Sequence, residues 1–263
     1  MRKYLAIFKT QLLTRLSYPA DLLGHGMTII IYLLVFIFLW RTTYRSTGSL
    51  EGTIAGLNLG QTIWYLMLAE TLMLSKPRLA GIISNAVKDG SIAYILNKPY
   101  NFLLYHFSVG LGDSLTNMVF NLFAGGILVW LMQAPPPDAW GWPLVLMTMI
   151  FAWLIDFCFA SLIGLAAFLL EDVTAFDWIY QKLLFILGGM LIPLDFFPSW
   201  LRSVSQASPF AYTIYGPARL FVDPGFGRFI DLLTGQLIWL AVLTAIVTVS
   251  YRRGIQWLAI NGG

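Results

Sequence analysis

The chain has 263 residues, of which 58% are hydrophobic and only 11% are charged, and its formal net charge is +3. Soluble domains average about 45–50% apolar and about 25% charged residues, so this composition excludes a soluble globular protein. The small net charge and the spread of Lys and Arg over short loops argue against nucleic-acid binding. The single cysteine, Cys158, excludes an internal disulfide.

Long apolar stretches predict an all-α membrane protein with a single transmembrane domain over residues 1–263. Residues 22–40 contain no Asp, Glu, Lys or Arg. A stretch of about 20 such residues crosses a bilayer core about 30 Å thick, because a helix satisfies its own backbone hydrogen bonds in lipid. The sequence predicts six spans, near residues 22–40, 57–75, 102–132, 143–170, 178–196 and 230–250.

Residues 2–17 precede the first span and predict an amphipathic helix on the membrane surface. Leu5, Phe8, Leu12 and Leu16 share one face of such a helix. The alternative is a basic flank that only sets the topology. Of the Lys and Arg residues, eleven fall in segments on the side of the N-terminus and five on the other side. This asymmetry predicts that both termini are cytoplasmic.

The cytoplasmic segment between the second and third spans, residues 76–101, is longer than a simple loop. Asp89-Gly90 closes a short helix within it, and Lys98-Pro99 forces an extended step into the third span. A loop packed on its own bundle is the alternative to a helix that faces the cytoplasm. The apolar stripe of the predicted helix consists of Leu79, Ile82, Ile83, Ala86 and Val87.

A second unusual segment, residues 188–210, follows the fifth span. Pro193 and Pro198 break the helix there, and Trp200 begins a short apolar stripe. Non-helical backbone at membrane depth persists only against protein or water. The sequence therefore predicts a re-entrant segment before the last span and a candidate outer gate at Gly189, Pro193, Pro198 and Trp200.

Three acids lie away from the ends of the predicted spans, and an unpaired carboxylate at the bilayer centre costs about 2.5–3.5 kcal/mol on insertion scales. Asp156 is the deepest, and we expect it either to face a cavity or to pair with a neighbouring helix. Glu70 and Asp113 lie toward the cytoplasmic ends, where a lysine or headgroup water can satisfy them. All three are candidate pore or substrate residues. The spacing Ala160-x-x-x-Gly164 predicts close helix packing, and the two histidines have no metal-ligand spacing.

The order of these parts resembles the type 2 ATP-binding-cassette (ABC) export permeases. The run from Asp89-Gly90 to Lys98-Pro99-Tyr-Asn101 resembles the pattern that follows the coupling helix of that family. The run from Gly189 through Pro193 and Pro198 to Ser208-Pro209 is similar to its C-terminal signature. The resemblance covers essentially the whole chain and is closest to the drug-resistance-type permeases.

The resemblance implies a multi-pass permease of the plasma membrane, in a bacterium the inner membrane, that forms half of an export pathway. It implies a second permease chain, identical or related, and an amphipathic drug, lipid or glycan-like substrate. A separate ATPase subunit is also implied, with ATP and Mg²⁺ bound there, because this chain has no phosphate-binding loop. We expect no catalytic residue, cofactor or metal on this chain. The implied coupling residues are Leu79, Ile82, Ile83, Ala86, Val87, Lys88, Asp89, Gly90, Lys98 and Pro99.

Two other classes of membrane protein remain as alternatives. An ATP-independent carrier or channel has less need of a cytoplasmic docking helix. An intramembrane aspartyl protease is suggested by Gly110-Leu-Gly-Asp113, but its chemistry needs a second aspartate close enough to share a proton. The only acid inside the earlier predicted spans is Glu70.

Overall fold

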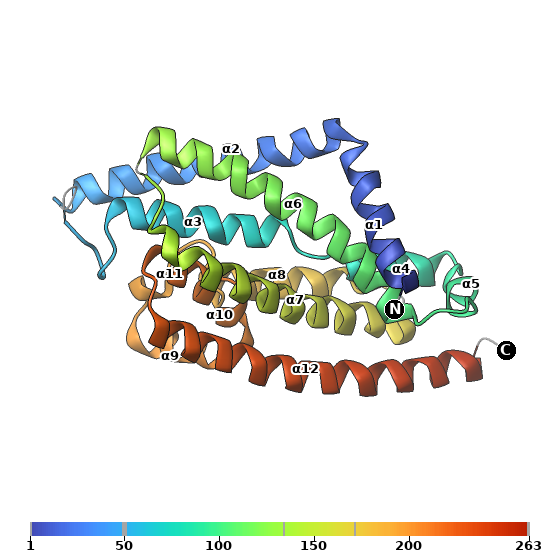
Figure 1. Cartoon of the computed structure of the whole chain (residues 1–263). Helices are drawn as coiled ribbons and strands as arrows, with labels where there is room; N and C mark the ends of the chain where they lie inside the picture. The colour runs from blue at the N-terminus through green and yellow to red at the C-terminus, as the bar shows by residue number, and fades with distance from the viewer. Residues whose placement is uncertain (1, 49–51, 134, 171, 262–263) are drawn as a thin grey trace.

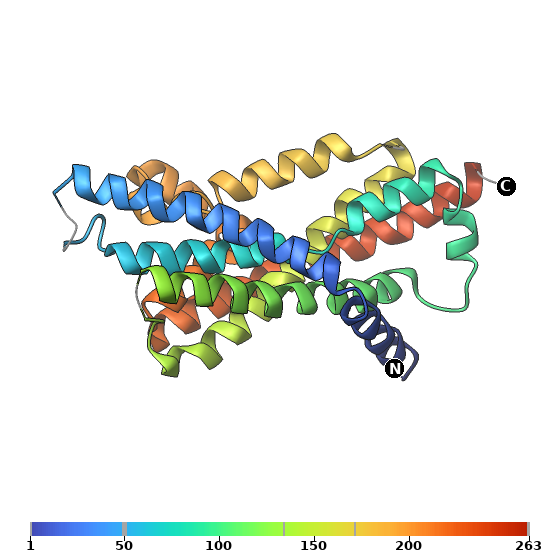
Figure 2. The same cartoon turned by 90° about the horizontal axis from the view of Figure 1, so that it is seen from above.

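The long helices of the chain run side by side in a bundle, as Figure 1 and Figure 2 show from two directions. This computed structural model describes residues 2–48, 52–133, 135–170 and 172–261. In chain order its α-helices are α1 (Arg2–Leu16), α2 (Pro19–Ser46), α3 (Leu59–Leu74), α4 (Leu79–Lys88), α5 (Ile92–Leu96), α6 (Phe102–Met132), α7 (Trp142–Leu170), α8 (Thr174–Ile186), α9 (Ser199–Ala207), α10 (Pro209–Thr213), α11 (Tyr215–Val222) and α12 (Phe226–Asn261). Two 3₁₀ turns, η1 (Ala139–Gly141) and η2 (Leu194–Phe196), complete the elements.

Four of these helices, α2, α6, α7 and α12, confirm predicted spans. Within the described residues, the segments long and apolar enough to cross a bilayer are Pro19–Ser46, Phe102–Met132, Ala139–Leu170 and Phe226–Gln256. Helix α6 has the predicted bounds. It begins where the side chain of Asn101 accepts a hydrogen bond from the backbone N–H of Leu104 at 3.0 Å, which satisfies a donor that the first turn leaves free.

The two other predicted spans are shorter helices. Helix α3 has 16 residues and α8 has 13, which at 1.5 Å per residue gives lengths of about 24 Å and about 20 Å. A bilayer core is about 30 Å thick. Helix α8 ends at Ile186 because the backbone turns at Gly189, whose φ of 69° favours glycine. The range 178–196 is therefore not one continuous helix, and four of the six predicted spans are found among the described residues.

Helix α3 is the centre of the bundle. Every residue from Thr62 to Leu72 is buried, so all sides of this helix are covered, as expected of a helix that is apolar all round. It packs against α2, α6 and α11. A reciprocal pair of hydrogen bonds starts it, in which Asn58 and Gln61 each accept the backbone N–H of the other at 2.8 and 3.0 Å.

The two ends of the bundle differ. Helices α1, α4 and α5 lie at one end together with both ends of the chain, and the short helices α9, α10 and α11 lie at the other (Figure 1). The segment 188–210 is therefore at the end opposite α4. The non-helical backbone of this segment is covered by protein in part, since Gly189, Pro193 and Leu194 are buried whereas Leu191 and Ile192 are exposed.

Helix α1 confirms the predicted N-terminal helix, which crosses the end of the bundle and packs on α6 (Figure 1). Leu5 and Leu16, which belong to the predicted apolar face, are exposed and so are not used in this contact. The two helices approach closely at Gly112, where an added Cβ would come within 3.0 Å of the Cβ of Gln11.

Candidate functional site

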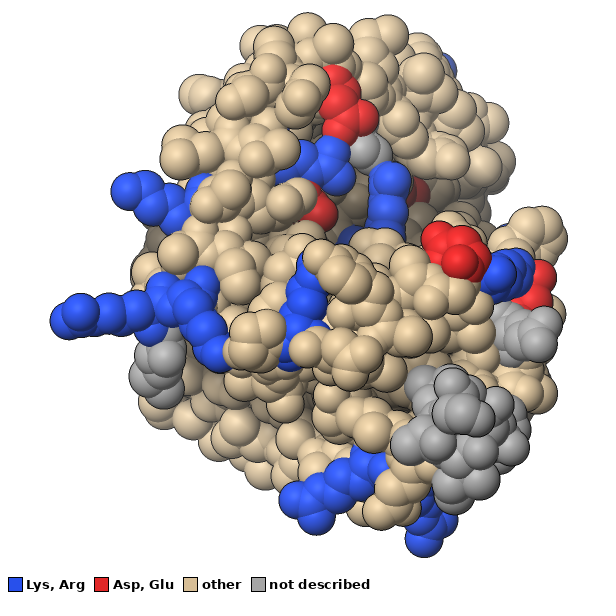
Figure 3. Space-filling model, turned by 90° about the vertical axis from the view of Figure 1, so that its right-hand side faces the viewer, with Lys and Arg blue, Asp and Glu red and all other residues tan. Residues whose placement is uncertain are grey.

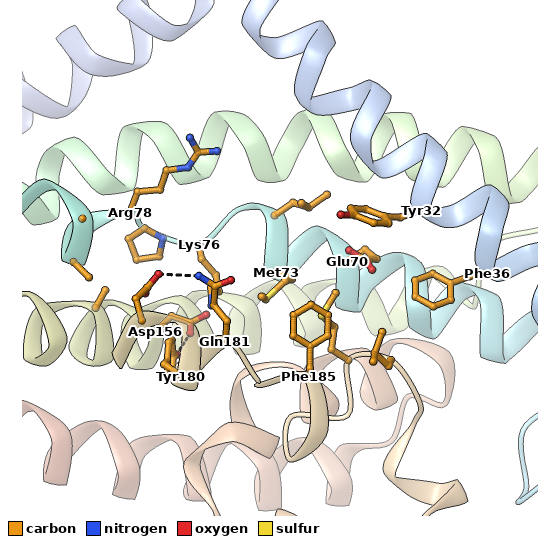
Figure 4. Close-up of a pocket in the computed structure, with 18 residues that line it drawn as sticks. Tyr32, Phe36, Glu70, Met73, Lys76, Arg78, Asp156, Tyr180, Gln181 and Phe185 are labelled. Atoms are coloured by element: carbon orange, nitrogen blue, oxygen red, sulfur yellow. Dashed lines mark hydrogen bonds between the residues drawn. The ribbon is translucent and has the colours of Figure 1, made fainter. Parts of the chain in front are cut away.

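A cavity of about 550 Å³ opens between α2, α3, α7 and α8, beside the segment that joins α3 to α4. Figure 4 shows its side chains in two groups, one with Lys76, Asp156 and Gln181 and the other around Glu70. Pockets for drug-sized ligands measure about 300–1,000 Å³. This cavity is therefore large enough for a small organic molecule.

Asp156 is buried on α7 and lines the cavity. The hydroxyl of Tyr180 on α8 donates a hydrogen bond to its carboxylate. The ammonium of Lys76 lies 4.6 Å from the centre of the Tyr180 ring. Burial lowers the pKa of Lys76, whereas the charges of Asp156 and Asp177 raise it. Asp156 thus both lines the cavity and pairs with a neighbouring helix, so the two expectations for this residue are compatible.

Glu70 lies on α3 in the other part of the cavity and is only 1% exposed. One of its carboxylate oxygens has no hydrogen-bond partner among the described residues. A lysine or headgroup water is expected to satisfy this acid, and the lysine that lines the cavity, Lys76, lies against Tyr180 instead. A buried carboxylate without a partner is costly to keep charged.

Asp113 does not line this cavity. The guanidinium of Arg15 donates to its carboxylate at 2.6 Å, and Gln11 donates at 2.8 Å. Arg15 also pairs with Asp21. Asp113 therefore ties α1 to α6 through an ion pair, instead of sharing a proton with a second carboxylate as an aspartyl protease requires. A smaller cavity of about 190 Å³ lies beside it.

Helix α4 turns one face toward α7. Leu79, Ile83 and Ala86 are buried there, so this face of the helix packs on its own bundle. The contact is close because Gly164 on α7 has no side chain, and a Cβ at that position would stand 2.6 Å from Cδ1 of Ile83. The close packing predicted from Ala160-x-x-x-Gly164 is confirmed at its glycine.

The opposite face of α4 is open. Ile82 is 45% exposed, Val87 is half-buried, and Lys88, Asp89 and Gly90 are exposed. The ammonium of Lys88 pairs with Asp172 at 2.9 Å, which connects α4 to the turn before α8. Lys and Arg side chains gather on this end of the molecule (Figure 3).

Lys98 and Pro99 follow α5 at the same end of the bundle. The Lys98 ammonium lies 4.5 Å from the centre of the Tyr94 ring, and Tyr94 is 69% exposed. The carbonyl of Pro99 accepts a hydrogen bond from Lys3 at 3.0 Å. Helix α1 is therefore attached to the segment that leads into α6.

The candidate outer gate is anchored at the other end. The Tyr65 hydroxyl donates to the carbonyl of Gly189 at 2.6 Å, and Arg202 donates to the carbonyl of Leu194 at 2.9 Å. Pro193 is buried between these contacts, whereas Pro198 and Trp200 are exposed. Arg219 of α11 pairs with Asp195 at 3.4 Å.

Reasoning from the sequence missed most of the cavity wall. In the sequence, Lys76 was used only in the count of Lys and Arg residues that predicts the topology, and Tyr180 and Gln181 were not identified as candidate site residues. A signal for them exists, because Asp177, Tyr180 and Gln181 recur at helical spacing and place polar groups on one side of α8. Gln181 donates to Asp177 at 2.8 Å along this side. Among the described residues, His, Cys, Asp and Glu form no group of three or more that could hold a metal ion.

The model of a protein family described as "ABC-2 family transporter protein" matches residues 30–262. The matched range contains every residue that lines the larger cavity and all of α4 and α5. A comparison with curated proteins finds no match.

Proposed function

Because the chain belongs to the ABC-2 family of transporter proteins, we propose that it is the membrane-spanning permease subunit of an ATP-driven exporter. It would form half of the translocation pathway, with the larger cavity as part of that pathway. Members of this family generally work with an ATPase partner. The proposal assigns ATP and Mg²⁺ to that partner and gives this chain no catalytic residue.

A single observation carries the proposal: the cavity wall and α4 are one continuous piece of chain. Lys76, Pro77 and Arg78 line the cavity, α4 begins at the next residue, and its Ala80 and Gly81 line the cavity as well. A partner that moves α4 would therefore move the cavity wall directly. Rigid displacement of this kind can switch the side from which a cavity is accessible.

The proposed docking surface for the ATPase is formed by Ile82, Val87 and Lys88 on α4 and by Asp89 and Gly90 in the turn that ends it, and is continued by Tyr94 on α5. The buried face of α4, formed by Leu79, Ile83 and Ala86, would transmit the movement of α4 to α7. The basic side chains at this end (Figure 3) support a cytoplasmic position for it and for both termini.

If the chain crosses the membrane six times, α3 and α8 must also be spans. Because both helices are shorter than the bilayer core, the residues that flank each of them must complete the crossing. In the proposal, the segment that follows α8 is re-entrant, and Gly189, Pro193, Pro198 and Trp200 belong to the outer gate. The hydrogen bond from Tyr65 to Gly189 supports this assignment, because it ties the segment to α3, and the bond from Arg202 to Leu194 holds the segment to itself. A second permease chain, identical or related, would complete the pathway.

Affinity purification in mild detergent tests the proposal. We expect the tagged protein to elute with a stoichiometric ATP-binding subunit and with ATPase activity. Ile82→Asp puts a charge on the exposed face of α4 and should remove that subunit. Val204→Asp is the matched control, since Val204 is 53% exposed on α9 at the opposite end, and it should leave the complex intact.

The alternatives predict other results. If the chain elutes alone and without ATPase activity, an ATP-independent carrier or channel takes precedence. If the ATPase co-elutes with Ile82→Asp as well as with Val204→Asp, the docking surface on α4 is wrong. A second permease in the eluate would show that the pathway is formed by two different chains.

A further inference from the structure

The cavity contains a carboxyl group, that of Glu70, with which no basic side chain of the described residues forms an ion pair. Glu70 is buried, and one of its oxygens has no partner among the described residues. A buried charge is normally paired, because desolvation of an isolated carboxylate is unfavourable. The side chain is therefore either kept neutral or neutralised by something that enters the cavity.

The two basic residues of the cavity wall, Lys76 and Arg78, do not form an ion pair with Glu70. Lys76 lies over the Tyr180 ring, and the acids whose charges act on it are Asp156 and Asp177. The guanidinium of Arg78 is turned away from the cavity, toward α6 (Figure 4). The part of the cavity around Glu70 therefore holds a carboxyl group with no basic side chain beside it, while the part around Lys76 holds that lysine together with Asp156 and Asp177.

Aromatic rings surround the unpaired acid. Tyr32 and Phe36 of α2 lie on one side of Glu70 and Phe185 of α8 on another, with Met73 of α3 nearby (Figure 4). Aromatic faces attract organic cations through the ring quadrupole, and a methionine adapts to irregular apolar shapes. Tyr32 is 47% exposed, so this part of the cavity reaches the surface of the chain.

We propose that the cavity binds an amphipathic organic cation, with its positive group at Glu70 and its apolar body along Tyr32, Phe36 and Phe185. This inference rests on the proposed function and names the substrate class for the same cavity. A lipid or glycan that carries a phosphate is disfavoured, since its charge would meet that of Glu70. The cavity volume of about 550 Å³ suits a cation of drug size.

The test compares two probes of similar size and opposite charge, tetraphenylphosphonium and tetraphenylborate. Each is titrated separately into the purified full chain in mild detergent, and binding is measured calorimetrically. We expect binding of the phosphonium and none of the borate. Glu70→Gln should weaken phosphonium binding about tenfold or more, which corresponds to about 1.4 kcal/mol. Asp113→Asn is the control, because Asp113 lies outside this cavity, and it should leave phosphonium binding unchanged.

The thermal stability of Glu70→Gln separates a binding role from a structural one. Removing an uncompensated charge should leave the melting temperature unchanged or raise it while phosphonium binding is lost. Equal binding of the two probes, or unchanged phosphonium binding by Glu70→Gln, would overturn the inference. A fall in melting temperature with no specific loss of binding would also overturn it, since Glu70 would then have a structural partner.

The two proposals fail in distinguishable ways. Cation binding by the purified chain needs no ATPase, whereas the permease assignment depends on the partner that co-elutes. A chain that selects the phosphonium but elutes without an ATPase supports the cation site and refutes the exporter subunit. A chain that elutes with its ATPase but does not distinguish the probes refutes the cation site alone.

Discussion

Replacing Gly164 by alanine should push α4 away from α7 and weaken the mechanical link between the docking surface and the cavity. The added methyl group would stand 2.6 Å from Cδ1 of Ile83 and 3.2 Å from its Cβ. Because the Cβ is also close, a rotation of the isoleucine side chain does not relieve the whole contact. Helix α4 itself must shift.

The magnitude follows from the packing of this contact. Extra methyl groups in a closely packed interior cost about 1–3 kcal/mol. Ile83→Ala removes the Cδ1 atom that would stand closest, but at a residue with 0% exposure it costs about 2–5 kcal/mol by itself. In the double variant the alanine at 164 occupies part of the space that the isoleucine leaves. The combined loss should therefore be smaller than the sum of the single losses by about 1 kcal/mol or more.

The assay is a double-mutant cycle of Gly164→Ala and Ile83→Ala in which two quantities are measured, the free energy of unfolding and the coupling of transport to ATP hydrolysis. Equilibrium unfolding in mixed micelles gives the free energies, and transport per ATP hydrolysed by the reconstituted complex gives the coupling. Gly126→Ala on α6 is the control, since its Cβ would meet nothing closer than the Trp64 ring at 3.9 Å. We expect the control to be neutral or slightly stabilising, because alanine favours a helix over glycine.

Two results would refute this reasoning. If the free energies of Gly164→Ala and Ile83→Ala simply add, the two residues do not meet as the structure shows. If Gly164→Ala is as mild as Gly126→Ala, α4 does not lie against α7 closely enough to transmit a displacement.

Three further predictions test other contacts. Asp156→Asn should lower the melting temperature more than Tyr180→Phe, because it also removes a charge that acts on the nearby lysine; equal losses would contradict this. Gly189→Ala should reduce the free energy of unfolding by about 1–2 kcal/mol in equilibrium unfolding, since φ is 69° there and a tyrosine hydroxyl lies 2.9 Å from the new Cβ; an unchanged value would contradict it. Hydrogen bonds from Thr174 and a lysine ammonium hold the pKa of Asp172 well below its usual 3.8. The ionised Asp172 carboxylate therefore makes its full contribution to stability above pH 3.8, and this contribution is lost as the pH falls further below 3.8. The difference in melting temperature between the protein and Asp172→Asn should shrink in acid, and a constant difference would contradict this.

The sequence by itself determined the long helices. Helix α6 occupies the predicted range 102–132, and α2, α7 and α12 contain their predicted spans. Helix formation over twenty apolar residues depends on the local chain, because each backbone group bonds to a residue four positions away. The helical state of Leu79–Lys88 and its end before Gly90, where φ is 74°, follow from the same local rules.

Only the tertiary structure decided which residues meet. Periodicity identified an apolar stripe on α4, but it did not show that Leu79 and Ile83 face α7 while Ile82 faces outward. Helical spacing likewise did not show that α8 would stop at Ile186.

The three acids show the same division. The sequence does not distinguish these three acids by their acidity, but the fold gives them different partners. Asp156 accepts a hydrogen bond from Tyr180, 24 residues away, and Asp113 accepts one from Arg15, 98 residues away. Glu70 has an oxygen with no partner among the described residues. Such contacts depend on how whole helices pack. Packing is decided by the shapes and charges of all neighbours together, and no single stretch of the sequence contains that information.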